Sequence, residues 1–140
     1  MKISEGDLAT LVAETWAPSV GLEVSIVDPP DDDEVPFVGF VELTGAWNGK
    51  VAVEASEDFL RDLAVIMFGV PSDEVSDEDR LDALGELSNV MAGNVKLFAG
   101  GDCEMSLPTK GRKAPHDPSL PELGFSVGGH LARLRVVSDT

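Results

Sequence analysis

The chain has few basic residues, a single cysteine and no long apolar run, and each shortage excludes a class of protein. Ten lysines and arginines stand against 26 aspartates and glutamates, a formal charge of −16, which repels nucleic acid and anionic membranes. The single cysteine cannot form an internal disulfide. No apolar run approaches the ~20 residues of a transmembrane helix, and the N-terminus carries no basic-then-apolar signal. We therefore expect a cytoplasmic protein that binds neither nucleic acid nor membranes.

Common metal, cofactor and nucleophile motifs are also missing. The two histidines, His116 and His130, are too few and too far from other ligand types to indicate zinc. No G-x-G-x-x-G or Walker pattern follows a strand, and no G-x-S-x-G turn is present. The acidic segment 28–34 lacks the spaced oxygens and glycine turn of a calcium loop, so we expect a solvated loop. Cys103 lies between two acidic residues, which disfavour a thiolate, so it is expected to be a strand residue. The sequence predicts no metal site and no cofactor of its own.

What remains is the composition of one folded domain. The chain has 140 residues, of which 43% are hydrophobic, and its 14 glycines and nine prolines are ordinary counts. A chain of this length can bury roughly two-thirds of the surface that its unfolded form exposes. We therefore expect a single domain over residues 1–140 rather than a disordered or low-complexity chain.

Periodicity divides the chain into helices and strands. Helical spacing, serine caps and glycine or proline stops predict three helices, from Ser4 to Trp16, from Ser56 to Gly69 and from Ser76 to Ala99. Alternating or β-rich runs predict six strands, at Leu22 to Val27, Phe37 to Leu43, Lys50 to Ala55, Cys103 to Pro108, Leu120 to Val127 and His130 to Val137.

The connections between these elements predict the fold class. An Asn-Gly turn at 48–49 joins the second and third strands, and Gly-Gly at 128–129 joins the last two, so both pairs are expected to be hairpins. Segregated helices with hairpin-joined strands are typical of an α+β fold rather than a doubly wound parallel sheet. We predict a two-layer sandwich, with the helices packed on one face of a mostly antiparallel sheet.

A basic cluster stands out in this acidic chain. Lys110, Arg112 and Lys113 fall in a predicted loop from Thr109 to Ser119. Two interpretations stay open: the cluster serves local solubility or internal pairing, or it binds a partner.

The third helix has two contrasting faces. At about 100° per residue, one face is apolar and predicted to be core, with Leu84, Leu87, Met91, Val95 and Phe98. Asp82, Glu86, Asn89 and Gly93 gather nearly opposite, so they are predicted to face outward. The core residues predicted for the whole fold are Trp16, Phe59, Met67, Leu84, Leu87, Met91 and Phe98.

The polar face has the composition of a binding site. Glu86 has Asp82 before it and Val90 after it at a spacing of four, so no cation on its own helix pairs with it. A carboxylate and an amide one turn apart, here Glu86 and Asn89, can hold a cation and hydrogen-bond a water. Gly93 costs the helix roughly 1 kcal/mol relative to alanine and leaves room for a partner. The alternative from these residues alone is a solvated helix face without a function.

The segment 82–94, "DALGELSNVMAGN", resembles the helix of the CheX, CheC and FliY family of chemotaxis phosphatases. The family pattern is Asp or Ser, three residues, Glu, two residues and Asn, with a proline further on, and Asp82, Glu86 and Asn89 match it. The resemblance extends to "LTGAWNGKVAVEAS" before the motif, to "SLPT" after it and to the terminal hairpin. A single motif copy is more like CheX than the duplicated CheC. One departure is Pro108, which lies closer to Asn89 than the family pattern has it.

The resemblance implies a phosphatase that acts on the phosphoaspartate of a CheY-like response-regulator receiver domain. Carried over to this chain, Glu86 docks the lysine of the receiver and Asn89 orients the attacking water, while Asp82 and Gly93 belong to the partner-binding face. Mg²⁺ would be supplied by the receiver.

Two other interpretations remain open beside the phosphatase. One is a CheX-like module of two-component signalling that binds receivers without hydrolysing phosphate. The other is a structural relative of the flagellar switch proteins. Self-association as a homodimer, where it occurs, is expected to use a strand edge or the terminal hairpin, because the motif helix must stay free to meet a receiver.

Overall fold

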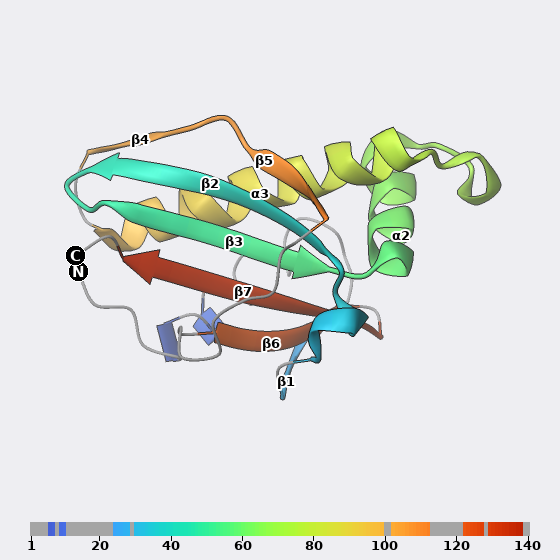
Figure 1. Ribbon diagram of the computed structural model, residues 1–140, viewed down its shortest axis with the longest axis horizontal. Helices are drawn as coiled ribbons and strands as arrows, with labels where there is room; N and C mark the ends of the chain where they lie inside the picture. Colours follow the sequence, from blue (N-terminus) through green and yellow to red (C-terminus); the bar gives the residue numbers. More distant parts are fainter. Residues whose placement is uncertain are drawn as a thin grey trace.

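The structure, a computed structural model, describes residues 6–7, 9–10, 24–28, 30–99, 102–112, 122–127 and 129–138 (Figure 1). In the described part of the chain, two long helices pack against a seven-stranded sheet of order β1-β6-β7-β3-β2-β4, in which β5 also pairs with β2. Every described strand pair is antiparallel, so the predicted α+β fold class is confirmed. The elements are β1 (Val24–Val27), the 3-10 turn η1 (Asp32–Glu34), β2 (Phe37–Gly45), β3 (Gly49–Ala55), α2 (Glu57–Phe68), the 3-10 turn η2 (Ser72–Glu74), α3 (Asp77–Ala99), β4 (Cys103–Met105), β5 (Thr109–Arg112), β6 (Glu122–Val127) and β7 (His130–Ser138).

Serine side chains begin both helices, as the sequence predicts. Ser56 Oγ accepts a hydrogen bond from the backbone N–H of Phe59 at 3.2 Å, and Gly69 ends α2 with a φ of 68°. At the start of α3, Ser76 Oγ accepts from the backbone N–H of Asp79, whose carboxylate accepts from the N–H of Ser76, both at 3.1 Å. This reciprocal capping box sets where the helix of the polar face begins.

The central hairpin also agrees with its prediction. β2 and β3 pair up to Leu43 opposite Gly49. In the turn, Asn48 Oδ1 accepts a hydrogen bond from the backbone N–H of Gly45 at 3.0 Å. Gly45 has a φ of 138°, a backbone conformation that only glycine adopts readily.

Two expectations for the segment after α3 are wrong. The strand expected from Cys103 to Pro108 ends at Met105, and Thr109–Arg112, expected to begin a loop, is strand β5. Both short strands pair with β2, β4 near its end and β5 near its beginning. The sequence Thr-Lys-Gly-Arg has little β propensity of its own, so the open edge of β2 decides its conformation. The rest of the expected loop, 113–119, lies outside the described residues.

The terminal hairpin, β6 with β7, lies inside the sheet. β6 also pairs with β1, and β7 also pairs with β3. Among the described strands, the sheet edges are therefore β1 on one side and β4 with β5 on the other. Of the two surfaces expected for self-association, only a strand edge is free of pairing within the sheet, and the homodimer stays a prediction.

The first expected helix falls mostly outside the described residues. Gly6, Asp7, Ala9 and Thr10 are helical, and Thr10 Oγ1 donates to the Gly6 carbonyl at 3.0 Å. Ala9 is partly buried against the core. Trp16, which was predicted to be a core residue, lies outside the described part of the chain.

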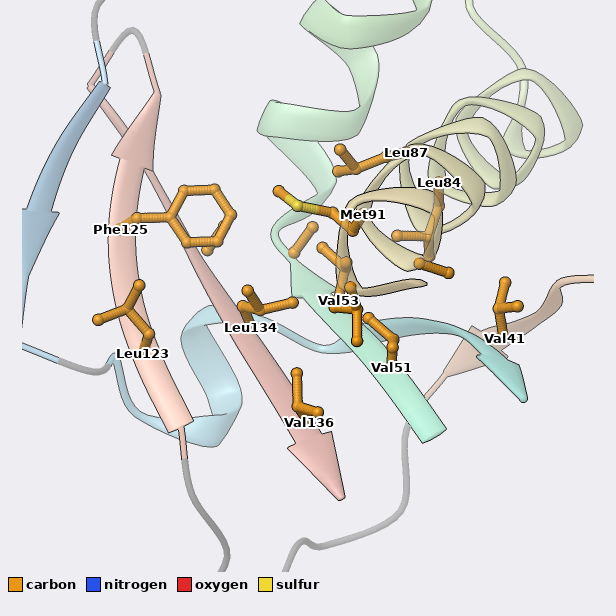
Figure 2. Close-up of a cluster of buried hydrophobic side chains, with 14 of the residues drawn as sticks. Val41, Val51, Val53, Leu84, Leu87, Met91, Leu123, Phe125, Leu134 and Val136 are labelled. Atoms are coloured by element: carbon orange, nitrogen blue, oxygen red, sulfur yellow. The ribbon is translucent and has the colours of Figure 1, made fainter. Parts of the chain in front are cut away.

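The core lies between the sheet and the helices (Figure 2), where side chains of α3 point toward those of β2, β3, β6 and β7. The predicted core is confirmed at four positions with exposures of 1% or less, Phe59, Leu84, Leu87 and Met91. Met67 is half-buried against the same cluster, and the side chain of Phe98 lies outside the described part. Each buried leucine stabilises the fold by roughly 1.5–3 kcal/mol.

The other face of the sheet buries charge. Glu54 on β3 and Arg133 and Arg135 on β7 alternate with core residues and so point away from α3. Glu54 accepts hydrogen bonds from Arg133 Nε at 2.7 Å and from Arg135 Nη1 at 3.3 Å. Arg133 also donates to the carbonyl of Pro30 at 3.1 Å. These bonds link the buried charges of β3 and β7 and offset part of the free energy that their desolvation costs.

Close approach of α3 to β2 depends on Gly39. A Cβ at this position would lie 2.3 Å from Ser88 Oγ and 2.9 Å from Leu84 Cγ. Ser88 is itself buried, and its hydroxyl donates to the Leu84 carbonyl at 2.8 Å. The depth at which α3 rests on the sheet is therefore set at Gly39, and the opposite side of the helix is turned to solvent.

Candidate functional site

The polar residues predicted on α3 lie on the side of the helix that faces away from the sheet. We call Asp82, Glu86, Asn89 and Gly93 the outer stripe. Asp82 and Glu86 are exposed, and Asn89 and Gly93 are half-buried. The residues that alternate with them around the helix, Leu84, Leu87, Met91 and Val95, are at most 1% exposed. The capping box and the buried face together hold the stripe in a defined orientation above the sheet.

Glu86 and Asn89 present a carboxylate and an amide to solvent one helical turn apart. Among the described residues, neither side chain has a hydrogen-bond or ion-pair partner. An exposed carboxylate can pair with a cation, and an amide offers one acceptor oxygen and two donor hydrogens. The pair can therefore hold a cationic group and orient a small polar molecule at the same time.

Asp82, by contrast, is already engaged within the chain. Its Oδ1 is 3.1 Å from the Nζ of Lys110 on β5, and β5 packs beside α3. Of the two interpretations of the basic cluster, internal pairing is therefore observed for Lys110. Lys110 and Asp82 are 28 residues apart in sequence, and β5, which brings Lys110 beside α3, was not predicted. The residue pattern of α3 therefore could not indicate this ion pair.

The segment before β5 crosses α3 at Gly85. A Cβ on Gly85 would lie 3.1 Å from Lys110 Nζ, 3.2 Å from Lys110 Cδ and 3.5 Å from Pro108 Cγ. Gly85 precedes Asn89 by one helical turn. Pro108, although early in the sequence for the family pattern, thus lies beside the turn that leads to Asn89, with Leu107 next to it 88% exposed.

Exposed apolar side chains continue the outer stripe beyond Asn89. Val90 is 43% and Leu97 78% exposed, and Gly93 lies between them on the same side of the helix. A Cβ on Gly93 would meet nothing within 4 Å. The seven-residue spacing of Val90 and Leu97, outside the core face, was the signal in the sequence that could have identified them. Apolar side chains next to a polar pair are typical of a protein-binding surface.

A second polar group lies between α2 and β7, away from the stripe. His130 Nε2 is 2.6 Å from Asp62 Oδ2, and the imidazole stacks on Phe59 at 6.0 Å between ring centroids. They border a cavity of about 290 Å³ that is otherwise mostly apolar. Cys103, expected as a strand residue, is buried on β4, and its Sγ is 3.6 Å from the carbonyl oxygen of Trp47.

Within the part of the chain that the structure describes, no helix has the length and apolar character needed to cross a membrane. No protein among those with curated descriptions matches the sequence significantly.

Several solved structures share the fold. CheX from Vibrio vulnificus superposes with a TM-score of 0.72 at 19% identity, covering 97% of this chain and 99% of that one. CheX from Desulfovibrio desulfuricans gives 0.70 at 18% identity, with 94% and 95% covered. CheX in a CheX-CheY-BeF3-Mg²⁺ complex from Borrelia burgdorferi gives 0.62 at 15% identity, with 92% and 90% covered.

The sequence itself also matches a family model, described as chemotaxis phosphatase CheX, over residues 37–123. This range is more than half of the chain and includes α2, the outer stripe and β5. The chain therefore belongs to the CheX family of chemotaxis phosphatases.

Proposed function

We propose that the chain hydrolyses the phosphoaspartate of a CheY-like receiver domain and that Glu86 and Asn89 carry this activity. The observation that carries the proposal is the exposed carboxylate of Glu86 and the half-buried amide of Asn89 one turn apart, without partners among the described residues. The pair lies within the residues that match the CheX family model. The choice of partner is supported by the CheX of Borrelia burgdorferi, whose structure is a complex with CheY, BeF3 and Mg²⁺.

Asn89 orients the attacking water. The water oxygen bonds to phosphorus while the bond from phosphorus to the aspartyl oxygen breaks, which yields a free carboxylate and an inorganic phosphate that carries both protons of the water. The Asn89 carbonyl accepts a hydrogen bond from the water. A neutral amide suits this place because another carboxylate beside the phosphoryl group would add repulsion. Positioning of the water supplies roughly 10²-fold in rate, or about 2.7 kcal/mol of barrier.

Glu86 docks the receiver. Its exposed carboxylate can reach a lysine ammonium on the receiver surface, a contact that governs association and register more than the chemical step. Side chains one turn apart have Cβ atoms about 5–6 Å apart. Once Glu86 is paired, Asn89 is therefore held at a fixed offset from the receiver lysine, within reach of the phosphoryl group.

The Mg²⁺ of the reaction belongs to the receiver in this proposal. A divalent cation at the phosphoryl oxygens neutralises charge that develops during transfer. The Borrelia burgdorferi complex contains Mg²⁺ together with CheY and BeF3. Over the described residues of this chain, no group of three or more His, Cys, Asp or Glu side chains is placed to hold a metal ion. The chain contributes docking and hydrogen-bonding groups, and the receiver contributes the metal.

The proposal is tested by following the decay of phosphorylated receivers of the same organism over a range of concentrations of this chain. Asn89→Ala should lower the decay rate at saturation by roughly 10²-fold and leave the half-saturating concentration nearly unchanged, since only a hydrogen bond of the transition state is lost. Asn89→Asp is the matched variant, because it keeps the shape but replaces the donor with negative charge, and it should be no faster than Asn89→Ala. Thermal unfolding of each variant checks that the fold is intact.

If Asn89→Ala removes phosphate as fast as the unmodified chain, the phosphatase mechanism is wrong for this protein. Retained binding of the receiver in that case would identify the chain as a non-catalytic CheX-like module.

A further inference from the structure

Lys110 lies at the edge of the outer stripe and has no role in the mechanism so far. Its Nζ is 3.1 Å from Asp82 Oδ1, and its side chain is still 31% exposed. We propose, on the basis of the function proposed above, that Lys110 contacts the anionic phosphoryl end of the docked receiver. Asp82 then acts by positioning Lys110 rather than by contacting the receiver itself.

Two features of the fold place the lysine side chain. β5 sets Lys110 opposite Gly39, which faces α3, so the side chain rises on the helix side of the sheet. The missing Cβ of Gly85 leaves space that Lys110 fills, since such a Cβ would be only 3.1 Å from Nζ and 3.2 Å from Cδ. The stem of the lysine therefore lies against the helix, and Asp82 determines where its ammonium ends.

This placement puts the ammonium beside Asp82 and Gly85, on the side of α3 that also carries Asn89. Gly85 precedes Asn89 by four residues and Asp82 precedes it by seven, so all three lie along one side of α3. A phosphoryl group that shares a water with Asn89 must approach this side of the helix. The ammonium of Lys110 then faces the phosphoryl oxygens.

The charge of the helix explains why a cation is useful here. α3 begins with three acidic residues in its first turn, followed by Asp82 and Glu86, in a chain of formal charge −16. This field opposes the approach of a phosphoryl group. Arg80, a second cation near this end of α3, is 17% exposed and pairs with Asp77 at 2.7 Å and Glu57 at 3.5 Å. Lys110 is more exposed and lies on the stripe side, so it is better placed to offset the repulsion.

The first measurement is the decay of phosphorylated receiver at low and high ionic strength. Lys110→Gln removes the charge and keeps a polar side chain that is one atom shorter. It should raise the half-saturating concentration by about threefold to tenfold at low salt, and this ratio should approach one at high salt, where screening removes the attraction. Lys110→Arg keeps the charge and should keep the salt dependence of the unmodified chain. Lys50→Gln is the matched control, because Lys50 lies over the Phe40 ring on the opposite face of the sheet, and it should leave the half-saturating concentration unchanged.

The second measurement separates positioning from direct contact. Asp82→Asn should weaken receiver binding in the unmodified chain but have no further effect in a Lys110→Gln background, because its action passes through the lysine. Binding to the phosphorylated receiver is measured at equilibrium as well as by decay, so a chain that binds without accelerating decay still tests the lysine. Thermal unfolding of all variants reports any loss of fold.

Two results would overturn the inference. One is a Lys110→Gln variant that binds like the unmodified chain at every salt concentration, which would leave the Lys110–Asp82 pair as a tie between β5 and α3. The other is an Asp82→Asn effect that persists in full without the lysine, which would make Asp82 itself the contact. Failure of the proposed function has a different signature, since the unmodified chain would then not accelerate decay at all.

Discussion

Helices α2 and α3 differ in whether their carboxylates have ion-pair partners. The three carboxylates of α2 each have a partner, Glu57 with Arg80 at 3.5 Å, Asp58 with Arg61 at 3.4 Å and Asp62 with His130 at 2.6 Å. On α3, Glu86 has no partner among the described residues. Glu78 has none either, but it lies in the first helical turn, where the helix dipole favours an anion. Glu86 lies mid-helix without that compensation, and this difference supports the proposed site on α3.

The largest effect is expected on the free energy of unfolding, from a substitution on the buried side of α3. On this side α2 and α3 should not differ, because both pack against the core. Leu87 is 1% exposed within the core, so Leu87→Ala should lower the free energy of unfolding by roughly 2–5 kcal/mol. Chemical denaturation measures this loss, and the decay rate per folded molecule should stay unchanged. A loss well under 1 kcal/mol would contradict the helix orientation on which the outer stripe depends.

A smaller effect is expected on receiver binding, from substitutions on the exposed sides of the helices. Here a carboxylate of α3 should matter and a carboxylate of α2 should not. Glu86→Ala should raise the half-saturating concentration for receiver by about threefold to tenfold, and Glu86→Lys should raise it further, because like charges would then meet at the receiver lysine. Asp58→Ala is the matched control on α2, where the side chain is 68% exposed. It should change stability by less than about 1 kcal/mol and binding not at all. Equal effects of Glu86→Ala and Asp58→Ala on binding would remove the distinction between the helices.

The smallest effect is expected at Gly93. Gly93→Ala should stabilise the chain by about 0.5–1 kcal/mol, since alanine favours the helix and the added methyl group meets nothing within 4 Å. If a partner uses this space, the same variant should bind receiver more weakly while unfolding at a higher temperature. A variant that is more stable and binds unchanged would show that the space beside Asn89 is not part of the interface.

Sequence patterning predicted the elements whose signals are local. The helix starts are marked by hydrogen bonds that span only three residues, made by Ser56, Ser76 and Asp79. The helical period of α3 likewise places Leu87 on the buried side and Glu86 on the exposed side without any information about the sheet. The Glu86 and Asn89 pair could be proposed from the sequence because both residues lie on one helix, and its role stays a prediction.

Features that depend on distant parts of the chain could not be predicted in this way. β5 exists because β2 has an open edge, and the ion pair of Lys110 with Asp82 follows from β5. Burial of Glu54 with Arg133 was equally hidden, because strand alternation shows which residues share a face but not what covers that face.

Gly39 is buried and would not contact a partner, but it affects the position of the proposed site. Because a Cβ there would press on Ser88 and Leu84, a larger residue at 39 must either lift α3 from β2 or be matched by a smaller residue above it. Across the family, the side-chain volumes at the positions of Gly39 and Ser88 should therefore vary in opposite directions. The height of Asn89 over the sheet, and with it the proposed alignment of the attacking water, would then depend on a pair of positions on the buried side of the helix.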